Sequence, residues 1–166
     1  MKKYIILSFT VFLLLSSTNT FAQQPITKMH SLYIYNFIKN VKWTNVGDSY
    51  IVGVFADDTT TEGIKTTIGS RTFNNKKIEV KKITSSSEAG DCHIVFVSTA
   101  QKSSIKQLAT PNILKNTLLV SEEGGIGQGV SIAFLLDNSK LKFKINEPVC
   151  KSSGLQISAT LLSLSQ

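Results

Sequence analysis

The sequence predicts an α/β domain, built as a three-layer sandwich in which a mixed, mainly parallel β-sheet is flanked by helices. Helical patterns alternate with short strand patterns along the chain, which is typical of a mainly parallel sheet. The apolar runs at 50–56 and 92–98 predict strands that are buried on both faces. Two strand patterns separated by a turn, at 130–136 and 141–145, predict a hairpin near the C-terminus. The hairpin must pair antiparallel, so the predicted sheet is mixed.

The first 22 residues have the composition of a signal peptide. Lys2 and Lys3 supply positive charge, residues 5–15 are almost entirely apolar, and Thr20-Phe21-Ala22 offers small residues at the −3 and −1 positions of a cleavage site. The apolar stretch is shorter than the ~20 residues that span a bilayer, although an uncleaved anchor is the alternative. We therefore expect cleavage after Ala22, a single domain at 23–166, a periplasmic location and no membrane-embedded segment.

The first helix of the mature chain is expected to begin at a Thr27 cap and to turn one face toward the core. The positions on this face follow the spacing of an α-helix and are Met29, Leu32, Tyr33, Asn36, Phe37 and Val41. Trp43 comes directly after the helix, where we expect it to plug the core.

Strands and helices continue to alternate after the strand at 50–56. An acidic turn, Asp57-Asp58, opens the next helix. The further predicted elements are a helix at 61–68, strands at 72–73 and 78–83 around a turn at 74–75, a loop or single helical turn at 85–90, a helix at 103–108, a strand at 117–120 and a glycine-rich loop at 121–129.

The last predicted helix follows the hairpin. Asn146 is its expected cap and Pro148 lies in its first turn, where a missing N–H does no harm. Its apolar face is predicted to consist of Val149, Ile157, Leu161 and Leu164.

Charge and composition exclude several classes of partner. The chain has 18 basic and 11 acidic residues; without Lys2 and Lys3 the mature domain has a net charge of +5. The lysines are scattered, and the doublets at 76–77 and 81–82 flank one short strand as a solvated face. We expect no nucleic-acid binding, because there is no continuous phosphate-binding track and an exported protein does not meet DNA. An acidic protein partner fits the charge better.

The sequence offers little to support catalysis or metal binding. The glycine loop at 125–129 lacks the G-x-G-x-x-G spacing and precedes a strand, so no helix N-terminus faces a phosphate. His30 and His93 form no metal-binding pair with each other or with a cysteine. Asp57 and Asp58 follow a strand, where α/β enzymes often place carboxylates, but a cap is the commoner role of such a turn. We therefore predict no catalytic set, no metal and no cofactor.

The two cysteines pose a redox question. One disulfide, Cys92–Cys150, is a candidate in an exported protein. The predicted topology places Cys92 at the start of its strand and Cys150 toward the opposite edge of the sheet, whereas a disulfide needs Cα atoms within about 7 Å of each other. Both states, bonded and free, stay open at this point.

Several segments, taken together and in order, resemble the YfiR family of small periplasmic proteins. They are residues 31–43 (SLYIYNFIKNVKW), 92–97 (CHIVFV), 118–122 (LLVSE) with the glycine loop and 129–132 (GVSI), 143–146 (FKIN), 153–158 (SGLQIS) and 161–164 (LLSL). Two features depart from the family pattern. Thr44 replaces the usual proline after Trp43, and the strand at 51–55 lacks the cysteine that some members carry there.

The resemblance implies a non-enzymatic regulator. Such proteins bind the periplasmic sensor domain of an inner-membrane diguanylate cyclase and inhibit it, so they control cyclic-di-GMP and biofilm formation; some relatives occur with histidine kinases instead. The resemblance also implies a homodimer. It singles out motif positions that serve the fold or an interface: Tyr35, Asn36, Trp43, Phe143 and Asn146.

Two other functions remain open on the sequence. One is a small-ligand-binding sensory module that works with a histidine kinase. The other is a periplasmic α/β enzyme that uses the carboxylates of Asp57 or Asp58.

Overall fold

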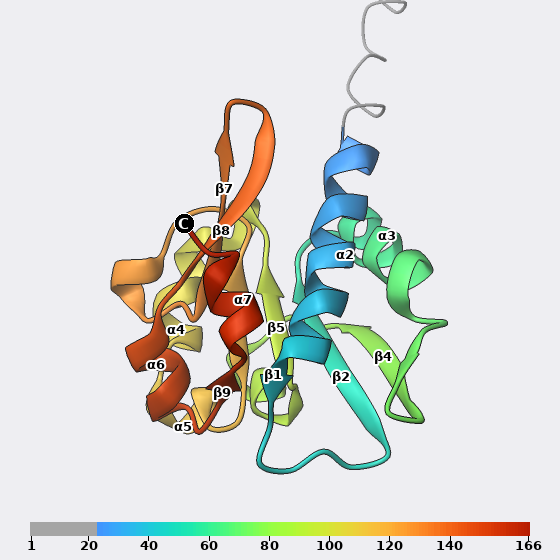
Figure 1. Ribbon diagram of the computed structural model, residues 1–166. Helices are drawn as coiled ribbons and strands as arrows, with labels where there is room; N and C mark the ends of the chain where they lie inside the picture. The colour runs from blue at the N-terminus through green and yellow to red at the C-terminus, as the bar shows by residue number, and fades with distance from the viewer. Residues whose placement is uncertain (1–22) are drawn as a thin grey trace, which may run out of the picture.

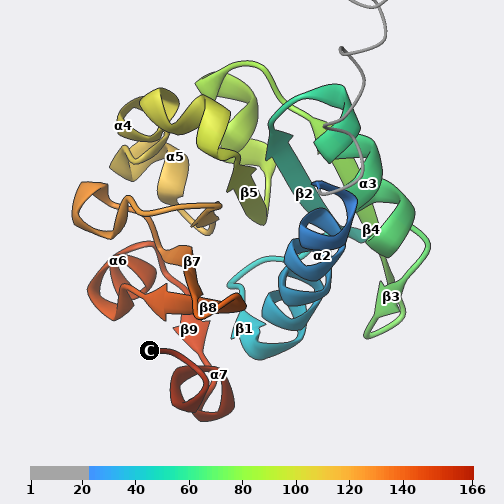
Figure 2. The same ribbon diagram turned by 90° about the horizontal axis from the view of Figure 1, so that it is seen from above.

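A computed structural model describes residues 23–166, and the predicted signal peptide at 1–22 lies outside the described residues. A seven-stranded sheet forms the middle layer, with the strand order β3-β4-β2-β5-β6-β7-β8. Helices cover both of its faces, and the view from above shows how the sheet curls between them (Figures 1 and 2). The predicted α/β class and its three layers are confirmed.

The strands and helices have the following bounds. The strands are β1 Val41–Lys42, β2 Ser49–Phe55, β3 Thr72–Phe73, β4 Lys76–Lys82, β5 Ile94–Val97, β6 Leu118–Ser121, β7 Ile132–Asp137, β8 Lys140–Ile145 and β9 Gln156–Ile157. The helices are α2 Gln23–Asn40, α3 Asp58–Ile68, α4 Ile105–Leu108, α5 Pro111–Leu114, α6 Glu147–Ser152 and α7 Ala159–Ser163. Short 3₁₀ helices are η1 Ser86–Asp91, η2 Thr99–Ser104 and η3 Ile126–Gln128.

The sheet is mixed and mainly parallel, as the sequence predicts. Strands β4, β2, β5, β6 and β7 run parallel, while β3 and β8 add antiparallel pairing at the two edges. The central strands β5 and β6 are buried at every residue because helices lie on both sides of them. A separate pair, β1 with β9, joins the end of α2 to the C-terminal segment.

Two hydrophobic cores fill the spaces between the layers. The larger core lies under α2 and α3 and contains Phe37 and Ile64 beside sheet residues such as Phe96. The smaller core lies under η1, α4 and α5 and contains Leu108 and Val95. Adjacent residues of β5 therefore point into different cores, which is the alternation that a strand imposes.

The first helix turns a different face to the core from the one predicted. Met29 and Leu32 are 40% and 37% exposed, whereas the core-facing side chains are His30, Ser31, Ile34, Phe37 and Ile38. Phe37 belongs to both faces, and Tyr33 of the predicted face is partly buried against the same core. Val41 is buried as well, in β1 just after the helix. The spacing therefore fitted two overlapping faces, and the packing partner decided between them. Thr27 is not the cap, because α2 begins at Gln23 and the Thr27 carbonyl oxygen accepts a hydrogen bond from Ser31 Oγ.

The last predicted helix is in fact two short helices. Asn146 caps α6 as predicted: its side chain accepts a hydrogen bond from the Val149 amide. The chain then turns at Gly154, which has a φ of +80° that favours glycine, and continues into β9 before α7 begins. Leu164 is 61% exposed and does not belong to a core face. The apolar spacing predicted one continuous helix, but Gly154 follows the end of α6 and separates it from α7.

Candidate functional site

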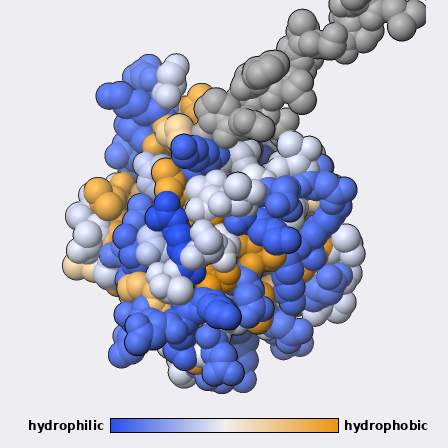
Figure 3. All heavy atoms as spheres, turned by 90° about the vertical axis from the view of Figure 1, so that its right-hand side faces the viewer, coloured by the Kyte–Doolittle hydropathy of each residue, from blue (hydrophilic) through white to orange (hydrophobic). Residues whose placement is uncertain are grey.

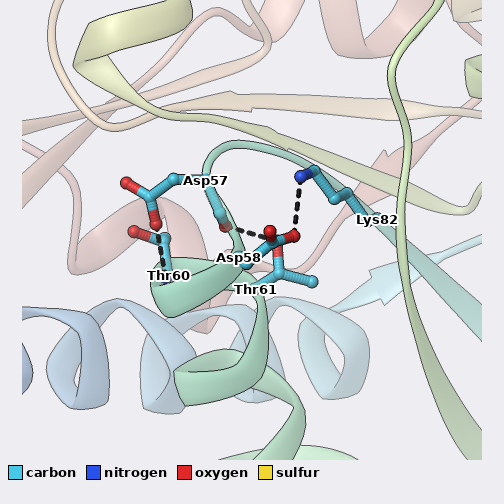
Figure 4. Close-up of polar contacts among 5 residues, drawn as sticks. All are labelled: Asp57, Asp58, Thr60, Thr61 and Lys82. Carbon is cyan, nitrogen blue, oxygen red and sulfur yellow. Dashed lines mark hydrogen bonds and ion pairs between the residues drawn. The ribbon is translucent and has the colours of Figure 1, made fainter.

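The acidic turn after β2 serves the fold (Figure 4). Asp57 Oδ1 accepts a hydrogen bond of 2.7 Å from the Thr60 amide, and the Asp57 carbonyl oxygen accepts one of 2.8 Å from Thr61 Oγ1. Asp58 pairs with Lys82 at 2.7 Å, and its side chain is 90% exposed. The two carboxylates thus cap α3 and tie it to β4. Helix α3 begins at Asp58, three residues earlier than the sequence predicts.

A second acidic pair, Glu122-Glu123, directly follows β6. The Glu122 amide donates to the Val97 carbonyl at 2.9 Å, and Glu122 Oε2 accepts from the Thr99 amide at 2.7 Å. These bonds hold the side chain of Glu122 against the end of β5. The loop then runs through Gly124 and Gly125, both with positive φ, into η3.

A pocket of about 610 Å³ opens beside this second acidic pair. It lies between the N-terminal half of α2 and the β7–β8 hairpin, which project toward the same end of the molecule (Figure 1). Its walls are apolar and include Ile26, Phe134, Leu136 and Leu141. Its polar residues are His30, Thr99, Glu122, Glu123 and Lys144.

His30 is the most unusual side chain of the pocket. It is 2% exposed, and its ring centroid lies 4.7 Å from that of Phe134 and 5.6 Å from that of Phe96. Its Nδ1 lies 3.8 Å from Glu122 Oε1, which is too long for a hydrogen bond. Burial lowers the pKa of His30, and the negative charge of Glu122 opposes part of that shift. Within residues 23–166 the ring has no hydrogen-bond partner.

Sequence reasoning did not find this pocket. Its two central residues are about ninety positions apart, on α2 and on the loop after β6, and only the fold brings them together. One sequence feature pointed to the pocket: Glu122-Glu123 directly follows a buried strand, as Asp57-Asp58 does. Open α/β sheets bind ligands outside the carboxyl ends of their strands, so each of the two acidic pairs is a candidate site on the sequence alone.

Three of the family-motif residues build the fold. Trp43 is buried and its Nε1 donates to the His93 carbonyl oxygen at 3.2 Å. Phe143 is buried, with its ring centroid 5.4 Å from that of Phe37. Asn146 caps α6, and its Nδ2 also donates to the Ile126 carbonyl at 3.0 Å, which ties the hairpin to the glycine loop.

The other two motif residues lie nearer the surface of α2. The half-buried ring of Tyr35 lies 4.9 Å from both Lys39 Nζ and Arg71 Cζ, and its hydroxyl donates to the Thr72 carbonyl at 3.2 Å. Asn36 is exposed. An interface role for any of the five motif residues stays a prediction.

His93 has a structural role. Its Nδ1 accepts a hydrogen bond of 3.0 Å from the Ile51 amide, and burial lowers its pKa. Among the described residues there is no group of three or more histidine, cysteine or acidic side chains that is arranged to hold a metal ion.

A sequence comparison identifies the family. Residues 27–166 match the profile of the family described as YfiR/HmsC-like. The chain belongs to this family. The match extends over nearly the whole described region and confirms the resemblance of the ordered motifs. No curated protein matches the chain.

The part of the chain that the structure describes contains no helix long and apolar enough to span a membrane. Its longest helix, α2, has 18 residues and carries His30 and two lysines.

Both cysteines are free thiols in the structure, so the candidate disulfide is not formed there. Cys92 packs in the smaller core and Cys150 in the larger one. Cys92 Sγ donates to the Glu88 carbonyl at 3.4 Å, and Cys150 Sγ to the Ser131 carbonyl at 3.8 Å. Burial raises the pKa of each thiol to about 11. The sheet itself separates the two thiols, because the two cores lie on its opposite faces. The predicted placement at opposite edges is wrong: Cys92 precedes β5 and Cys150 contacts Ser131 just before β7, so both lie at the same end of these parallel strands.

Proposed function

We propose that this protein is a non-enzymatic periplasmic regulator. It binds the sensor region of an inner-membrane diguanylate cyclase and holds the cyclase inactive, which limits cyclic-di-GMP and biofilm formation. The observation that carries this proposal is membership of the YfiR/HmsC-like family over residues 27–166. The turn at Asp57-Asp58 adds support, because its carboxylates are engaged in capping and in an ion pair.

The regulator must reach the periplasm. We propose that residues 1–22 are removed as a signal peptide and that the mature chain begins at Gln23 as a single domain. Osmotic shock should release a protein whose N-terminal sequence starts at Gln23. Full-length protein that begins at Met1 and stays in the cytosol would contradict both the export and the regulatory role.

The charge of the domain favours an acidic partner. The mature chain has 16 basic and 11 acidic residues. The face that carries α3 and β4 is largely hydrophilic, with hydrophobic residues showing near its centre (Figure 3). Exposed lysines lie toward both ends of the sheet: Lys77 is on β4, next to the edge strand β3, and Lys140 and Lys144 are on the edge strand β8. Salt screens such charges, so association with an acidic sensor domain should weaken as ionic strength rises.

A pull-down from solubilised membranes tests the proposal. Tagged mature protein should capture an inner-membrane protein that carries a diguanylate cyclase domain, and capture should fall between about 0.05 M and 0.5 M salt. Two charge-reversal baits show which end of the sheet binds: Lys77→Glu on β4, and the double substitution Lys140→Glu with Lys144→Glu on β8. Capture of a histidine kinase would favour the other partner class. Recovery of no membrane sensor protein by a folded bait would contradict the proposal.

We also propose that the regulator is a homodimer, as the family resemblance implies. Sedimentation velocity of the mature protein should give twice the mass of one chain at micromolar concentration. A monomer at every concentration tested would remove this part of the proposal and leave the regulatory role standing.

A further inference from the structure

The pocket between α2 and the β7–β8 hairpin has the properties of a small-molecule site. Its volume of about 610 Å³ lies within the range of ligand pockets. It opens at the carboxyl ends of β5 and β6, which is the place where open α/β sheets bind ligands. Apolar side chains from α2, β7 and β8 make most of its wall, so the body of a ligand there would be apolar.

Two polar residues that line the pocket, His30 and Glu122, do not form a hydrogen bond with each other. His30 is 2% exposed, yet its ring forms no hydrogen bond within the described residues. Glu122 Oε1 lies 3.8 Å from His30 Nδ1, while Oε2 is already occupied by the Thr99 amide. A ligand group that hydrogen-bonds to both His30 Nδ1 and Glu122 Oε1 would therefore supply a partner that the protein itself does not provide.

The spacing of these two atoms fits one ammonium nitrogen. In the neutral His30 tautomer that carries its proton on Nε2, Nδ1 is an acceptor, and Glu122 Oε1 is an acceptor as well. A nitrogen about 2.8 Å from each acceptor forms two normal hydrogen bonds and spans a gap of this size. An anionic head group would meet the carboxylate and would be repelled.

The local charge agrees with this geometry. The carboxylates of Glu122 and Glu123 lie at the pocket and the ammonium of Lys144 at its exposed rim, so the lining is net negative while His30 is neutral. The loop that bears the glutamates is held in place at Gly125, whose φ is +85° and where a Cβ would lie 2.7 Å from Val130 Cγ2. The site is therefore part of the folded scaffold.

We infer that this pocket binds a small organic cation, a primary amine on an apolar body, with its ammonium group between His30 and Glu122. This inference goes beyond the proposed regulatory function and does not rest on it. The ligand can be an amine that the regulator senses, and the site exists whether or not the membrane partner is a cyclase.

Proton NMR of the mature protein tests the inference, with phenethylamine as the probe. The chain has two histidines, so the Hε1 resonance of His30 reports on the pocket and that of His93 is an internal control. Phenethylamine should shift the His30 resonance in a saturable way and leave His93 unchanged. Phenylacetate and 2-phenylethanol have the same apolar body with an anionic or a neutral head, and they should produce no saturable shift at equal concentration.

Two variants locate the ammonium group. Glu122→Gln should weaken phenethylamine binding at least about tenfold, because it removes a charged hydrogen bond. The matched control Glu62→Gln removes one exposed carboxylate from α3, outside the pocket, and should bind as the wild type does. Should Glu122→Gln fold poorly, Leu136→Lys serves instead, because Leu136 is 65% exposed and a positive charge on this wall should also repel the amine.

Three results would overturn the inference. Phenethylamine that leaves the His30 resonance unmoved at saturating millimolar concentration removes the site. Equal shifts by all three probes show that the head group is not recognised. Equal weakening by Glu122→Gln and Glu62→Gln shows that the amine responds only to the total charge of the protein.

Discussion

The two acidic pairs that follow β2 and β6 look alike in the sequence and differ in the structure. At Asp57-Asp58 every carboxylate has a local task, either capping α3 or pairing with Lys82 in solvent. At Glu122-Glu123 one carboxylate oxygen holds the chain in place, and the other points toward a buried histidine that has no hydrogen bond. An acidic pair after a strand is therefore not enough to mark a site.

What separates the two regions is the element that comes next. Asp57 leads into a helix whose first turn has free amides, and the Thr60 amide donates a hydrogen bond to the Asp57 carboxylate. Glu122 leads into a glycine loop and faces α2 and the hairpin across a pocket, so its charge does not cap a helix and can interact with a group in the pocket.

The largest effect should come from the wall of the pocket. Phe134 is 1% exposed and packs against the rings of His30 and Phe37. Phe134→Ala should lower the free energy of unfolding by about 3–5 kcal/mol, because it leaves a cavity in the larger core. Leu136→Ala, on the same strand but 65% exposed, is the matched control and should change it little. Denaturant unfolding measures both, and equal losses would mean that the hairpin does not close the pocket as described.

A smaller effect should come from the cap of α3. Asp57→Ala should lower the free energy of unfolding by about 1 kcal/mol, since the Thr60 amide loses its acceptor. Asp58→Asn, next to it, should have no measurable effect because its pair with Lys82 is exposed. Thermal or denaturant unfolding separates the two. A larger loss from Asp58→Asn would show that the ion pair, and not the cap, holds this turn.

The pocket histidine should make stability depend on pH. Burial lowers the pKa of His30 in the folded state below its unfolded value of about 6.5, so the unfolded chain binds the extra proton first. The free energy of unfolding should therefore fall as pH decreases from about 7 toward 5. His93 contributes in the same direction, because burial lowers its pKa too. His30→Gln should reduce the slope, and an unchanged slope in a folded variant would contradict a buried neutral His30.

Reduction of the thiols should have no effect on the free energy of unfolding. Cys92 and Cys150 lie in different cores, so a reducing agent should leave the free energy of unfolding unchanged. Thiol titration of denatured, unreduced protein should count two free thiols. In the native protein both should react slowly, because each is buried with a pKa of about 11. A monomer with no free thiol would mean that the disulfide exists.

The sequence predicted the strands well and the functional geometry poorly. Continuous apolar runs such as the one at 94–97 identify buried strands without any knowledge of their neighbours. The sequence could not show which face of α2 is buried, because the residues that pack on Ile34 and Ile38 come from distant strands. The pocket could not be predicted for the same reason. His30 and Glu122 indicate a site only when they lie side by side, and the fold brings them together.

Cyclic-di-GMP in a deletion strain tests the central claim most directly. Deleting the gene should raise cyclic-di-GMP, because losing a ligand that stabilises the inactive cyclase shifts the population toward the active state. Complementation with the wild type, and equally with the double variant Asp57→Asn and Asp58→Asn at the same periplasmic abundance, should restore the low level, since these carboxylates serve only the fold. An unchanged level on deletion, or a folded double variant that fails to restore it, would contradict the account of a non-enzymatic repressor.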